Sequence, residues 1–426
     1  MSRLFKKIEN VDNALRKYLS LIKTRILEVE NIPLEDATGR ILAEDLYSNV
    51  DIPPFNRSAM DGYAVRAEDT YGASENNPVR LRVIGESAVG YPYTNTVQRG
   101  EAVKIHTGAV VPDGANAVVP IEYVEEYGNY IEVFRSVSPS DNIGKKGEDI
   151  KKGEIVLLKG TVLRPYDLAL VKSLGYTTIR VFRKLKVAVF SCGDELVDQA
   201  VNIEELHGKI IDSNRLMIKS YLWELNCEVI DLGIIRDDIE EIKSTILKAK
   251  NIADLLITIG GTSVGEKDFV PSAINNVGNP GIIIRGISAS PGRPLVLSLI
   301  DDFPIISLPG YPVATFVDFI VFAIPVIEKM IGIRGLRIPN TIKAKLKRRV
   351  PSKPGVRHYV RVKIFRENND FVANPIRITG SGVLSSITKA DGLLIIPEDI
   401  EGYEAGEIVD VVLLRDRIGV WNEKNI

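Results

Sequence analysis

The chain has 426 residues, a formal net charge of −2 at pH 7 and a hydrophobic fraction of 45%. This length predicts two to four domains with buried cores. The near-neutral charge gives no basis for binding nucleic acid or an anionic membrane. The two cysteines, Cys192 and Cys227, lack CxxC spacing and the 3 histidines are scattered, which argues against a disulfide framework and a zinc or His-rich site.

The sequence contains no segment that resembles a signal peptide or a membrane span. The N-terminus, MSRLFKKIENVDNALRKY, reaches acidic residues before any apolar core. The most apolar long stretch, residues 315–333, is interrupted by Asp318, Pro325 and Glu328, which favours a buried helix. We therefore predict a soluble cytoplasmic protein with no membrane or nucleic-acid partner.

The first 182 residues predict a mixed domain with a β insertion. Residues 8–29 have helical spacing, and the turn-rich segment SNVDIPPFNRSAMDGYAV is followed by short β-like runs. The chain then passes through SDNIGKKGEDIKKGE to RPYDLALVKSLGY, which has a helical pattern. We predict a discontinuous N-terminal mixed domain, residues 1–46 and 145–182, with an inserted all-β domain, residues 47–144.

The remaining chain predicts an α/β domain followed by a β domain. Strand-like KLKVAVFSC, CEVIDLGII, ADLLITI and FPIISLPG alternate with the helical SNRLMIKSYLWEL, DDIEEIKSTILKAK and VATFVDFIVFAIPVIEKMIG. This alternation is typical of a parallel, doubly wound sheet, in which ligands bind at the carboxyl ends of the strands. We predict this α/β domain over residues 183–332 and a small C-terminal β barrel or sandwich over residues 333–426.

Five acids lie in turns next to glycine instead of on amphipathic faces: Asp61, Asp149, Glu195, Asp237 and Asp268. Any one of them alone is most simply a solvated turn acid or a helix cap. Several together at strand ends favour function, because loops on a rigid scaffold are where functional residues gather. Clustered carboxylates suit Mg²⁺, which is held by few carboxylates together with phosphate oxygens.

A glycine-rich loop, GGTSVGEKD, is the candidate phosphate cradle, with Gly260, Gly261, Ser263 and Gly265. It matches neither the Walker A loop nor the dinucleotide fingerprint, although free backbone N–H groups at a helix start suit an anion. A strand-to-helix turn also requires glycine, so both interpretations stay open.

Further polar residues are candidates for anion binding. Arg293 lies on a Pro-Gly turn, and Arg357 and Ser381 lie in the C-terminal β region, where an ordinary charged β face is the alternative. Thr107 ends a β run and either contacts an oxyanion or pairs within a turn, whereas we interpret His106 as structural. Pattern alone thus indicates metal-assisted phosphate chemistry in an α/β protein.

Eight motifs together resemble the MoeA/gephyrin family, the molybdopterin molybdenumtransferases. In family order they are PPFNRSAMDGYAV, HTGAVVPDGANAVV, GKKGEDI, SCGDEL, GIIRDD, GGTSVGEKDF, PGRP and SLPGYPVA, which span nearly the whole chain. The resemblance implies a mixed N-terminal domain with a β insertion, a molybdopterin-binding α/β domain and a C-terminal β-barrel-like domain.

The resemblance also implies an activity: Mg²⁺-dependent insertion of molybdate or tungstate into adenylylated molybdopterin, with release of AMP. It implies a homodimer with an inter-subunit site, and a molybdopterin adenylyltransferase and apo-molybdoenzymes as partners. The implied catalytic residues are Asp61, Thr107, Asp149, Glu195, Asp237 and Asp268, of which Glu195, Asp237 and Asp268 are assigned to Mg²⁺. Which of these acids orients the attacking water is left open by the resemblance. The implied substrate-binding residues are Gly260, Gly261, Ser263, Gly265, Arg293, Pro309, Gly310, Arg357 and Ser381.

The chain departs from the family pattern at a few positions. Ser290 stands where a lysine is common, Tyr311 where asparagine is usual, and Cys192 where threonine or serine is common. Two alternative functions remain, a molybdopterin adenylyltransferase and a non-enzymatic pterin-binding scaffold. The intact SAMDGYA and KGEDI motifs outside the α/β domain argue against the first, and the retained acids argue against the second.

Overall fold

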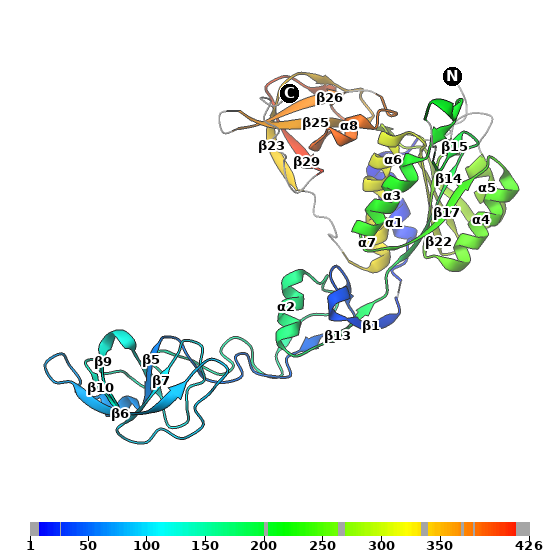
Figure 1. The fold of residues 1–426 in the computed structure, drawn as a ribbon. Helices are drawn as coiled ribbons and strands as arrows, with labels where there is room; N and C mark the ends of the chain where they lie inside the picture. The colour runs from blue at the N-terminus through cyan, green and yellow to red at the C-terminus, as the bar shows by residue number, and fades with distance from the viewer. Residues whose placement is uncertain are drawn as a thin grey trace. The chain divides into compact units, whose positions relative to one another are not determined.

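The computed structural model describes residues 8–25, 27–199, 203–262, 269–333, 340–367, 370–377 and 380–414. The chain divides into two compact units. Unit 1 combines Met1–Glu28 with Arg183–Ile426, and unit 2 is the continuous segment Val29–Phe182. Figure 1 shows the elements of both units along the chain.

A six-stranded sheet forms the centre of the α/β part of unit 1, in the order β17-β14-β18-β22-β21-β19. Strands β17 to β22 of this order run parallel, and β21 and β19 add an antiparallel edge. The buried central strands explain the uninterrupted apolar runs in the sequence. The bounds are β14 Lys186–Cys192, β17 Glu228–Ile235, β18 Leu255–Ile259, β19 Pro280–Arg285, β21 Val296–Ile300 and β22 Phe303–Leu308.

Helices cover both faces of this sheet, which confirms the predicted doubly wound architecture. Figure 1 shows α4 and α5 on one face and α1, α3, α6 and α7 on the other. Side-chain caps fix two helix starts at the carboxyl edge of the sheet, because Asp212 accepts the N–H of Arg215 (3.1 Å) and Asp238 accepts that of Glu241 (2.8 Å). The bounds are α1 Val11–Leu21, α3 Ser213–Glu224, α4 Ile239–Ile252, α5 Phe269–Val277, α6 Pro312–Asp318 and α7 Ile324–Ile331.

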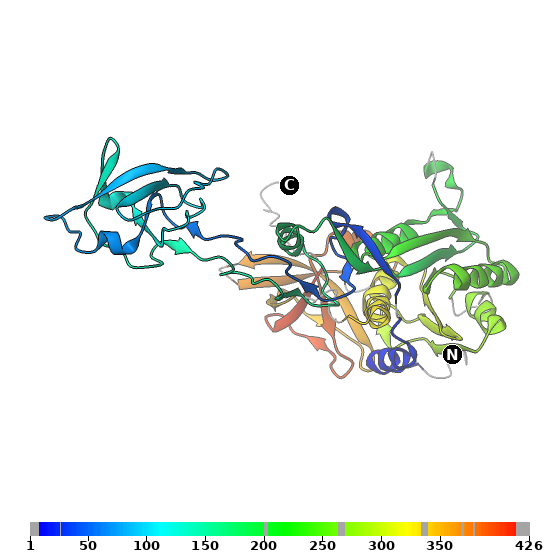
Figure 2. The ribbon, with the colours of Figure 1, turned by 90° about the horizontal axis from the view of Figure 1, so that it is seen from below.

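Helix α1 belongs with this sheet, whereas the sequence prediction grouped it with residues 145–182. The hydroxyl of the buried Tyr18 donates to the carbonyls of Ser298 (2.7 Å) and Ile305 (3.2 Å). Figure 2 shows α1, in dark blue, beside the helices of unit 1. The apolar face of an amphipathic helix fits any apolar surface, so its spacing predicts the helix but not its neighbour.

The buried helix predicted after Pro309 is present, with a change of winding in the middle. A π-helical segment, Phe319–Ala323, joins α6 to α7. The N–H of Ile324 bonds to the carbonyl of Phe319, and Pro325 follows at the start of α7. The wider turn accommodates a proline that would disrupt a regular helix. None of the helices in the described ranges is long and apolar enough to cross a membrane.

The C-terminal part of unit 1 is a closed barrel, which confirms the predicted barrel-like domain. Its strands pair in the cycle β25-β26-β23-β29-β27-β25, and the short β20 pairs with β25 from outside. The barrel is drawn in orange and red in Figures 1 and 2. The bounds are β20 Ala289–Ser290, β23 Thr341–Leu346, β25 Arg357–Glu367, β26 Asp370–Arg377, α8 Ser385–Thr388, β27 Gly392–Ile396 and β29 Ile408–Leu413.

Unit 2 contains two β regions. The first is the three-stranded sheet β1-β13-β2 with helix α2, and the second is the six-stranded sheet β8-β5-β7-β6-β10-β9. Apolar clusters lie on both faces of the larger sheet, because Tyr63 and Val65 join one cluster and Ala64 the other. The bounds are β1 Val29–Pro33, β2 Ile41–Leu42, α2 Pro165–Ser173, β13 Thr178–Phe182, β5 Gly62–Val65, β6 Val79–Ser87, β7 Glu101–Ile105, β8 Ala117–Pro120, β9 Val124–Tyr127 and β10 Tyr130–Val133.

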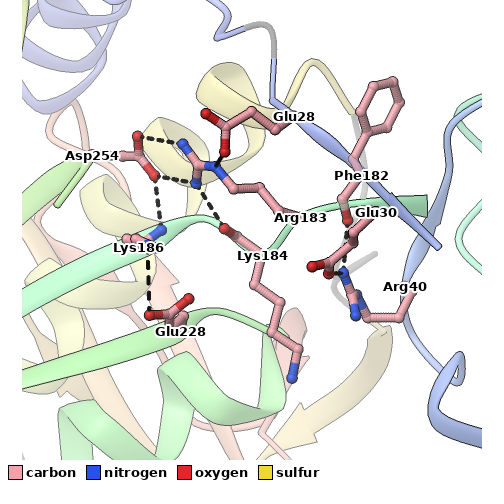
Figure 3. A network of polar contacts seen from close by, with 9 residues as sticks. All are labelled: Glu28, Glu30, Arg40, Phe182, Arg183, Lys184, Lys186, Glu228 and Asp254. Carbon is pink, nitrogen blue, oxygen red and sulfur yellow. Dashed lines mark hydrogen bonds and ion pairs between the residues drawn. The ribbon is translucent and has the colours of Figure 1, made fainter. Parts of the chain in front are cut away.

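Ion pairs and hydrogen bonds within each unit hold the chain at the points where it passes between the two units (Figure 3). In unit 1, Arg183 forms a bidentate pair with Asp254 (2.8 and 3.1 Å) and a second pair with Glu28 (3.2 Å). In unit 2, Arg40 pairs with Glu30 and donates to the carbonyl of Phe182 (2.8 Å). The N–H of Arg183 also bonds to the carbonyl of Glu28 (2.8 Å), so the chain enters and leaves unit 1 at adjacent residues.

Candidate active site

The carboxyl ends of the parallel strands bring four predicted loops together. The N–H of Gly193, after β14, donates to the carbonyl of Ile235 at the end of β17 (3.2 Å). The N–H of Gly260, after β18, donates to Leu308 at the end of β22 (3.0 Å). Ligands of doubly wound sheets bind at this edge. The structure thus places SCGDEL, GIIRDD, GGT and SLPGY side by side.

Three carboxylates gather around the end of β14. The N–H of Asp237 donates to Asp194 (3.2 Å), and the Cys192 thiol donates to Asp237 Oδ1 (3.2 Å). The Glu195 carboxylate lies so close to Gly193 that a Cβ there would be 2.8 Å from its oxygens. Burial, and then the charges of Asp237, Glu195 and Asp194, raises the pKa of Cys192. The thiol therefore stays protonated beside a concentration of negative charge.

These carboxylates are of the ligand type that Mg²⁺, the ion implied by the sequence, prefers. Within the described ranges, no group of three or more His, Cys, Asp and Glu residues is arranged as a metal site. Asp268, the third predicted ligand, lies outside the described residues, as do Ser263 and Gly265 of the same loop.

The two described glycines of that loop are required by the backbone. Gly260 and Gly261 have φ values of 84° and 66°, which L-residues rarely adopt. A Cβ on Gly260 would lie 2.5 Å from the carbonyl oxygen of Cys192. A Cβ on Gly261 would lie 2.6 Å from Cγ2 of Val270. The glycines thus let the chain turn tightly after β18 against the end of β14, where the acids lie.

The fourth loop meets a segment from the barrel. Asn214, at the start of α3, donates to the carbonyl of Gly310 (2.7 Å), which holds the Pro309–Gly310 turn. The N–H of Val313 donates to the carbonyl of Ser381 (2.9 Å). Tyr311 is exposed and packs against Gly382. Pro309, Gly310 and Ser381, predicted from distant parts of the sequence, are therefore neighbours, and the ring of Tyr311 covers the junction.

The predicted arginines have different surroundings. Arg293 is exposed on the turn after Gly292. Arg357 forms a bidentate pair with Asp12 (2.7 Å for both bonds) and contacts Glu398 (3.0 Å), so its guanidinium is engaged by protein carboxylates. These contacts favour a structural role for Arg357.

Arg361, which the sequence offers beside Arg357 as either an anion-binding residue or part of a charged β face, is the stronger anion-binding candidate of the two. Its side chain is 1% exposed, and Nε donates to the hydroxyl of Ser386 (3.3 Å). Burial lowers the pKa of Arg361, and the charge of Arg377 lowers it further. Two arginines this close in a barrel wall favour a nearby anion. The alternation of side chains along a strand does not by itself distinguish a buried arginine from an exposed one.

In unit 2 the structure brings Asp61 and Thr107 together. The N–H of Thr107 donates to Asp61 Oδ1 (2.8 Å). This bond, followed by one from the Thr107 side chain and by the charge of His106, lowers the pKa of Asp61. Asp149 is exposed on a separate loop, and its N–H donates to Ile52 (3.0 Å). Asp61 is thus an oriented, ionised carboxylate at the surface of unit 2.

His106 has polar partners, as a structural histidine would. Its side chain is 45% exposed and lies between Glu86 and Asp61. The residue thus belongs to the polar cluster at Asp61. Glu86 comes from another strand, which is why motif reading did not find it.

Known protein families match the chain over most of its length. The MoeA N-terminal region (domain I and II) matches residues 9–175, the probable molybdopterin-binding domain matches 188–329, and the MoeA C-terminal region (domain IV) matches 343–414. The chain is 34% identical over 415 residues to a molybdopterin molybdenumtransferase of Bacillus subtilis, covering 96% of this chain and 95% of that protein. The chain belongs to the MoeA family.

Two further MoeA-type relatives support this assignment. A Methanocaldococcus jannaschii protein, named for molybdopterin biosynthesis, is 41% identical over 394 residues, covering 91% of this chain and 93% of that protein. The crystal structure of the molybdopterin biosynthesis MoeA protein of Pyrococcus horikoshii has a TM-score of 0.80 at 38% identity, covering 96% of this chain and all of that chain. The predicted family and fold class are therefore confirmed.

Proposed function

We propose that the protein is a cytoplasmic molybdopterin molybdenumtransferase that inserts molybdate or tungstate into adenylylated molybdopterin and releases AMP in a Mg²⁺-dependent hydrolysis. The observation that carries this proposal is the cluster of Asp194, Glu195 and Asp237 beside the Gly260–Gly261 turn, in a chain of the MoeA family. Acids beside a phosphate-type turn suit the cleavage of a pyrophosphate linkage.

At the strand ends, Glu195 and Asp237 would hold Mg²⁺ together with Asp268. When bound, Mg²⁺ neutralises the phosphate charge and polarises the phosphoryl oxygens. The Gly260–Gly261 turn, Ser263, Gly265 and Arg293 would bind the phosphate or pterin side of the substrate. Pro309, Gly310 and Ser381 would line the neighbouring part of the substrate site, because the N–H of Val313 holds the carbonyl of Ser381 beside the Pro309–Gly310 turn.

A homodimer would bring the remaining residues to this site. The strand-end acids lie in unit 1, whereas Asp61, Thr107 and Asp149 lie in unit 2. We propose that unit 2 of one protomer completes the strand-end site of its partner. Thr107 donates to Asp61 through its N–H and bonds to it through its side chain, so Thr107 would orient the Asp61 carboxylate for the substrate. A molybdopterin adenylyltransferase would supply the substrate, and apo-molybdoenzymes would receive the product.

The test is to incubate the purified protein with adenylylated molybdopterin, Mg²⁺ and either molybdate or tungstate, and to follow AMP. We expect oxyanion-dependent AMP release that falls by about 10²-fold or more in Asp61→Asn and Asp237→Asn. The control is Asp113→Asn, an exposed turn acid in the same unit as Asp61.

Other outcomes would favour the alternatives. AMP transfer from ATP to free molybdopterin would indicate an adenylyltransferase. Tight pterin binding without AMP release, unchanged in both acid variants, would indicate a scaffold. Mn²⁺ binding measured by electron paramagnetic resonance gives a separate readout, and it should weaken in Asp237→Asn but not in Asp61→Asn.

A further inference from the structure

A two-stranded ribbon in unit 1 holds the loop that carries Asp194 and Glu195. This loop follows β14, and its strand β15 runs parallel to β16. The N–H of Ile210 donates to the carbonyl of Glu195 (2.8 Å), and Lys209 Nζ donates to the carbonyl of Asp194 (2.5 Å). The positions of the two acids therefore depend on the residues that lead into α3. The bounds are β15 Leu196–Val197 and β16 Ile210–Ile211.

Arg215, in the first turn of α3, holds the ends of both strands of this ribbon. Its Nε donates to Asp212, which follows β16 (2.9 Å), and its Nη2 donates to Asp198, which follows β15. The N–H of Asp212 also donates to the carbonyl of Val197 (2.9 Å). The side chains of Arg215 and Asp212 are 8% and 2% exposed, so solvent screens their pair little. The guanidinium thus connects the ribbon to α3 in a buried position.

The same guanidinium contacts β17, the strand that leads to Asp237. Nη1 of Arg215 donates to Asp231 Oδ1. Directly after Asp231 the register of β17 against β14 shifts, because β17 has one residue more in the bulge. The N–H of Gly233, which lies in the bulge with a φ of 81°, donates to the same carboxylate oxygen (3.0 Å). A bulge changes the direction of the residues that follow it, so the contacts of Asp231 bear on where Asp237 lies.

Carboxylates from three segments of the chain surround this guanidinium. Asp198, Asp212 and Asp231 contact it, and Lys219, one turn later on α3, also pairs with Asp231. A buried ionic network of this kind adds little net stability relative to a packed apolar core, because each charge loses its hydration. It specifies geometry instead, since every member must keep its partners. The network thus fixes the Glu195 loop relative to the end of β17.

We propose that Arg215 is a positioning residue for the strand-end site. It places Glu195 through the ribbon and Asp237 through the bulge of β17, so that both carboxylates bind the same divalent cation. The planar guanidinium suits this task because its donors have fixed directions, whereas a lysine ammonium has no such fork. The inference rests on the function proposed above, which assigns both acids to Mg²⁺.

The test is Mn²⁺ binding by the full-length protein, measured by electron paramagnetic resonance, together with AMP release at increasing Mg²⁺. Arg215→Lys keeps the charge but cannot make the same directed bonds to three carboxylates. We expect it to weaken Mn²⁺ binding by about 10- to 100-fold, as changes at residues that orient metal ligands do. Its slow AMP release should recover as Mg²⁺ is raised, which loss of fold would not allow. The matched control is Lys219→Met, which removes another cation that pairs with Asp231 and should leave Mn²⁺ binding unchanged.

A second variant decides the matter if Arg215→Lys does not fold. Asp198 is 67% exposed, so Asp198→Asn weakens the contact with the ribbon while the buried Arg215–Asp212 pair remains. It should also weaken Mn²⁺ binding, by less than Arg215→Lys. Wild-type Mn²⁺ affinity in a folded Arg215→Lys, or in Asp198→Asn, would overturn the inference. A wild type that binds Mn²⁺ but releases no AMP would contradict the proposed reaction and leave the positioning role in place, whereas one that binds no Mn²⁺ would overturn both.

Discussion

Asp318 has a fully buried carboxyl group, and neither oxygen has a hydrogen-bond partner among the described residues. It ends α6 and faces the Pro-Gly-Arg turn, where a Cβ on Gly292 would lie 2.1 Å from Oδ1. Burial raises the pKa of Asp318 well above its usual range. Burial therefore holds the Asp318 carboxyl in its neutral form. Glycine is the only residue type that fits at position 292, because a side chain there would clash with this carboxyl.

Asp318 should make the stability of unit 1 depend on pH. The pKa of Asp318 is higher in the folded than in the unfolded state. Its contribution to the free energy of unfolding is therefore fully present below the unfolded-state pKa of about 3.9 and is lost as pH rises toward the folded-state pKa. Asp318→Asn should therefore be increasingly more stable than the wild type between pH 4.5 and 8. Unfolding midpoints measured across this range would test it, and a pH-independent difference would contradict the assignment.

At the scale of the element, Asp254 aligns the starts of two central strands. It precedes β18, accepts the N–H of Lys186 at the start of β14 (2.9 Å), and binds Arg183 through both oxygens. Burial alone would raise the pKa of Asp254, but the bonds from Arg183 and Lys186 outweigh it and lower the pKa. The side chain is 9% exposed, so solvent screens this pair little.

Asp254→Asn should destabilise the protein by about 3 kcal/mol at pH 7, because it leaves a largely buried arginine without its partner. Because the pKa of Asp254 is lower in the folded state, its contribution to the free energy of unfolding is present above the unfolded-state pKa. This contribution is lost as pH falls through the folded-state pKa. The difference should therefore shrink in acid. Urea unfolding at pH 7 and below about pH 3, under the unfolded pKa of about 3.9, measures both, with Asp302→Asn, from the exposed Lys23–Asp302 pair, as the control.

The hydrophobic pattern along the sequence predicted most helices and strands, but not every pairing between strands. The apolar runs gave β14, β18 and β22, and the turn acids and glycines after them marked the carboxyl edge. The antiparallel pair β21 and β22 was not predicted, because two fully buried strands joined by Asp301 and Asp302 form a nearly continuous apolar run. The Glu86–His106 contact was not predicted, and Arg361 could not be separated from an ordinary charged β face, since burial and cross-strand contacts are not encoded in local spacing.

At the scale of the whole molecule, unit 2 is an insertion into unit 1. The chain leaves unit 1 after Glu28 and returns at Arg183, and these two residues are hydrogen-bonded to each other. Unit 2 has apolar clusters of its own. The sequence analysis predicted a different insertion, of residues 47–144 into an N-terminal domain, because the contacts of Tyr18 in α1 lie 280 and 287 residues away and leave no local signal.

Each unit should therefore fold without the other. Replacing residues 29–182 by a short Gly-Ser linker should give a unit 1 protein with cooperative thermal unfolding, because the linker spans neighbouring residues. Residues 29–182 expressed alone should also unfold cooperatively. Neither should release AMP, since Asp61 and the strand-end acids are then separated. Circular dichroism and calorimetry would measure folding, and an unfolded linker variant would contradict this view.

The position of α1 also bears on how the protein is made. The ribosome makes this helix long before the strands it packs against, because the carbonyls that receive the Tyr18 hydroxyl belong to Ser298 and Ile305. At about 5–20 residues per second, synthesis of the intervening 287 residues takes roughly 15–60 s. During that time unit 2 can complete its own fold, while the apolar face of α1 has no sheet to cover. Helix α1 therefore waits for its partner strands through the synthesis of all of unit 2 and of most of the α/β sheet.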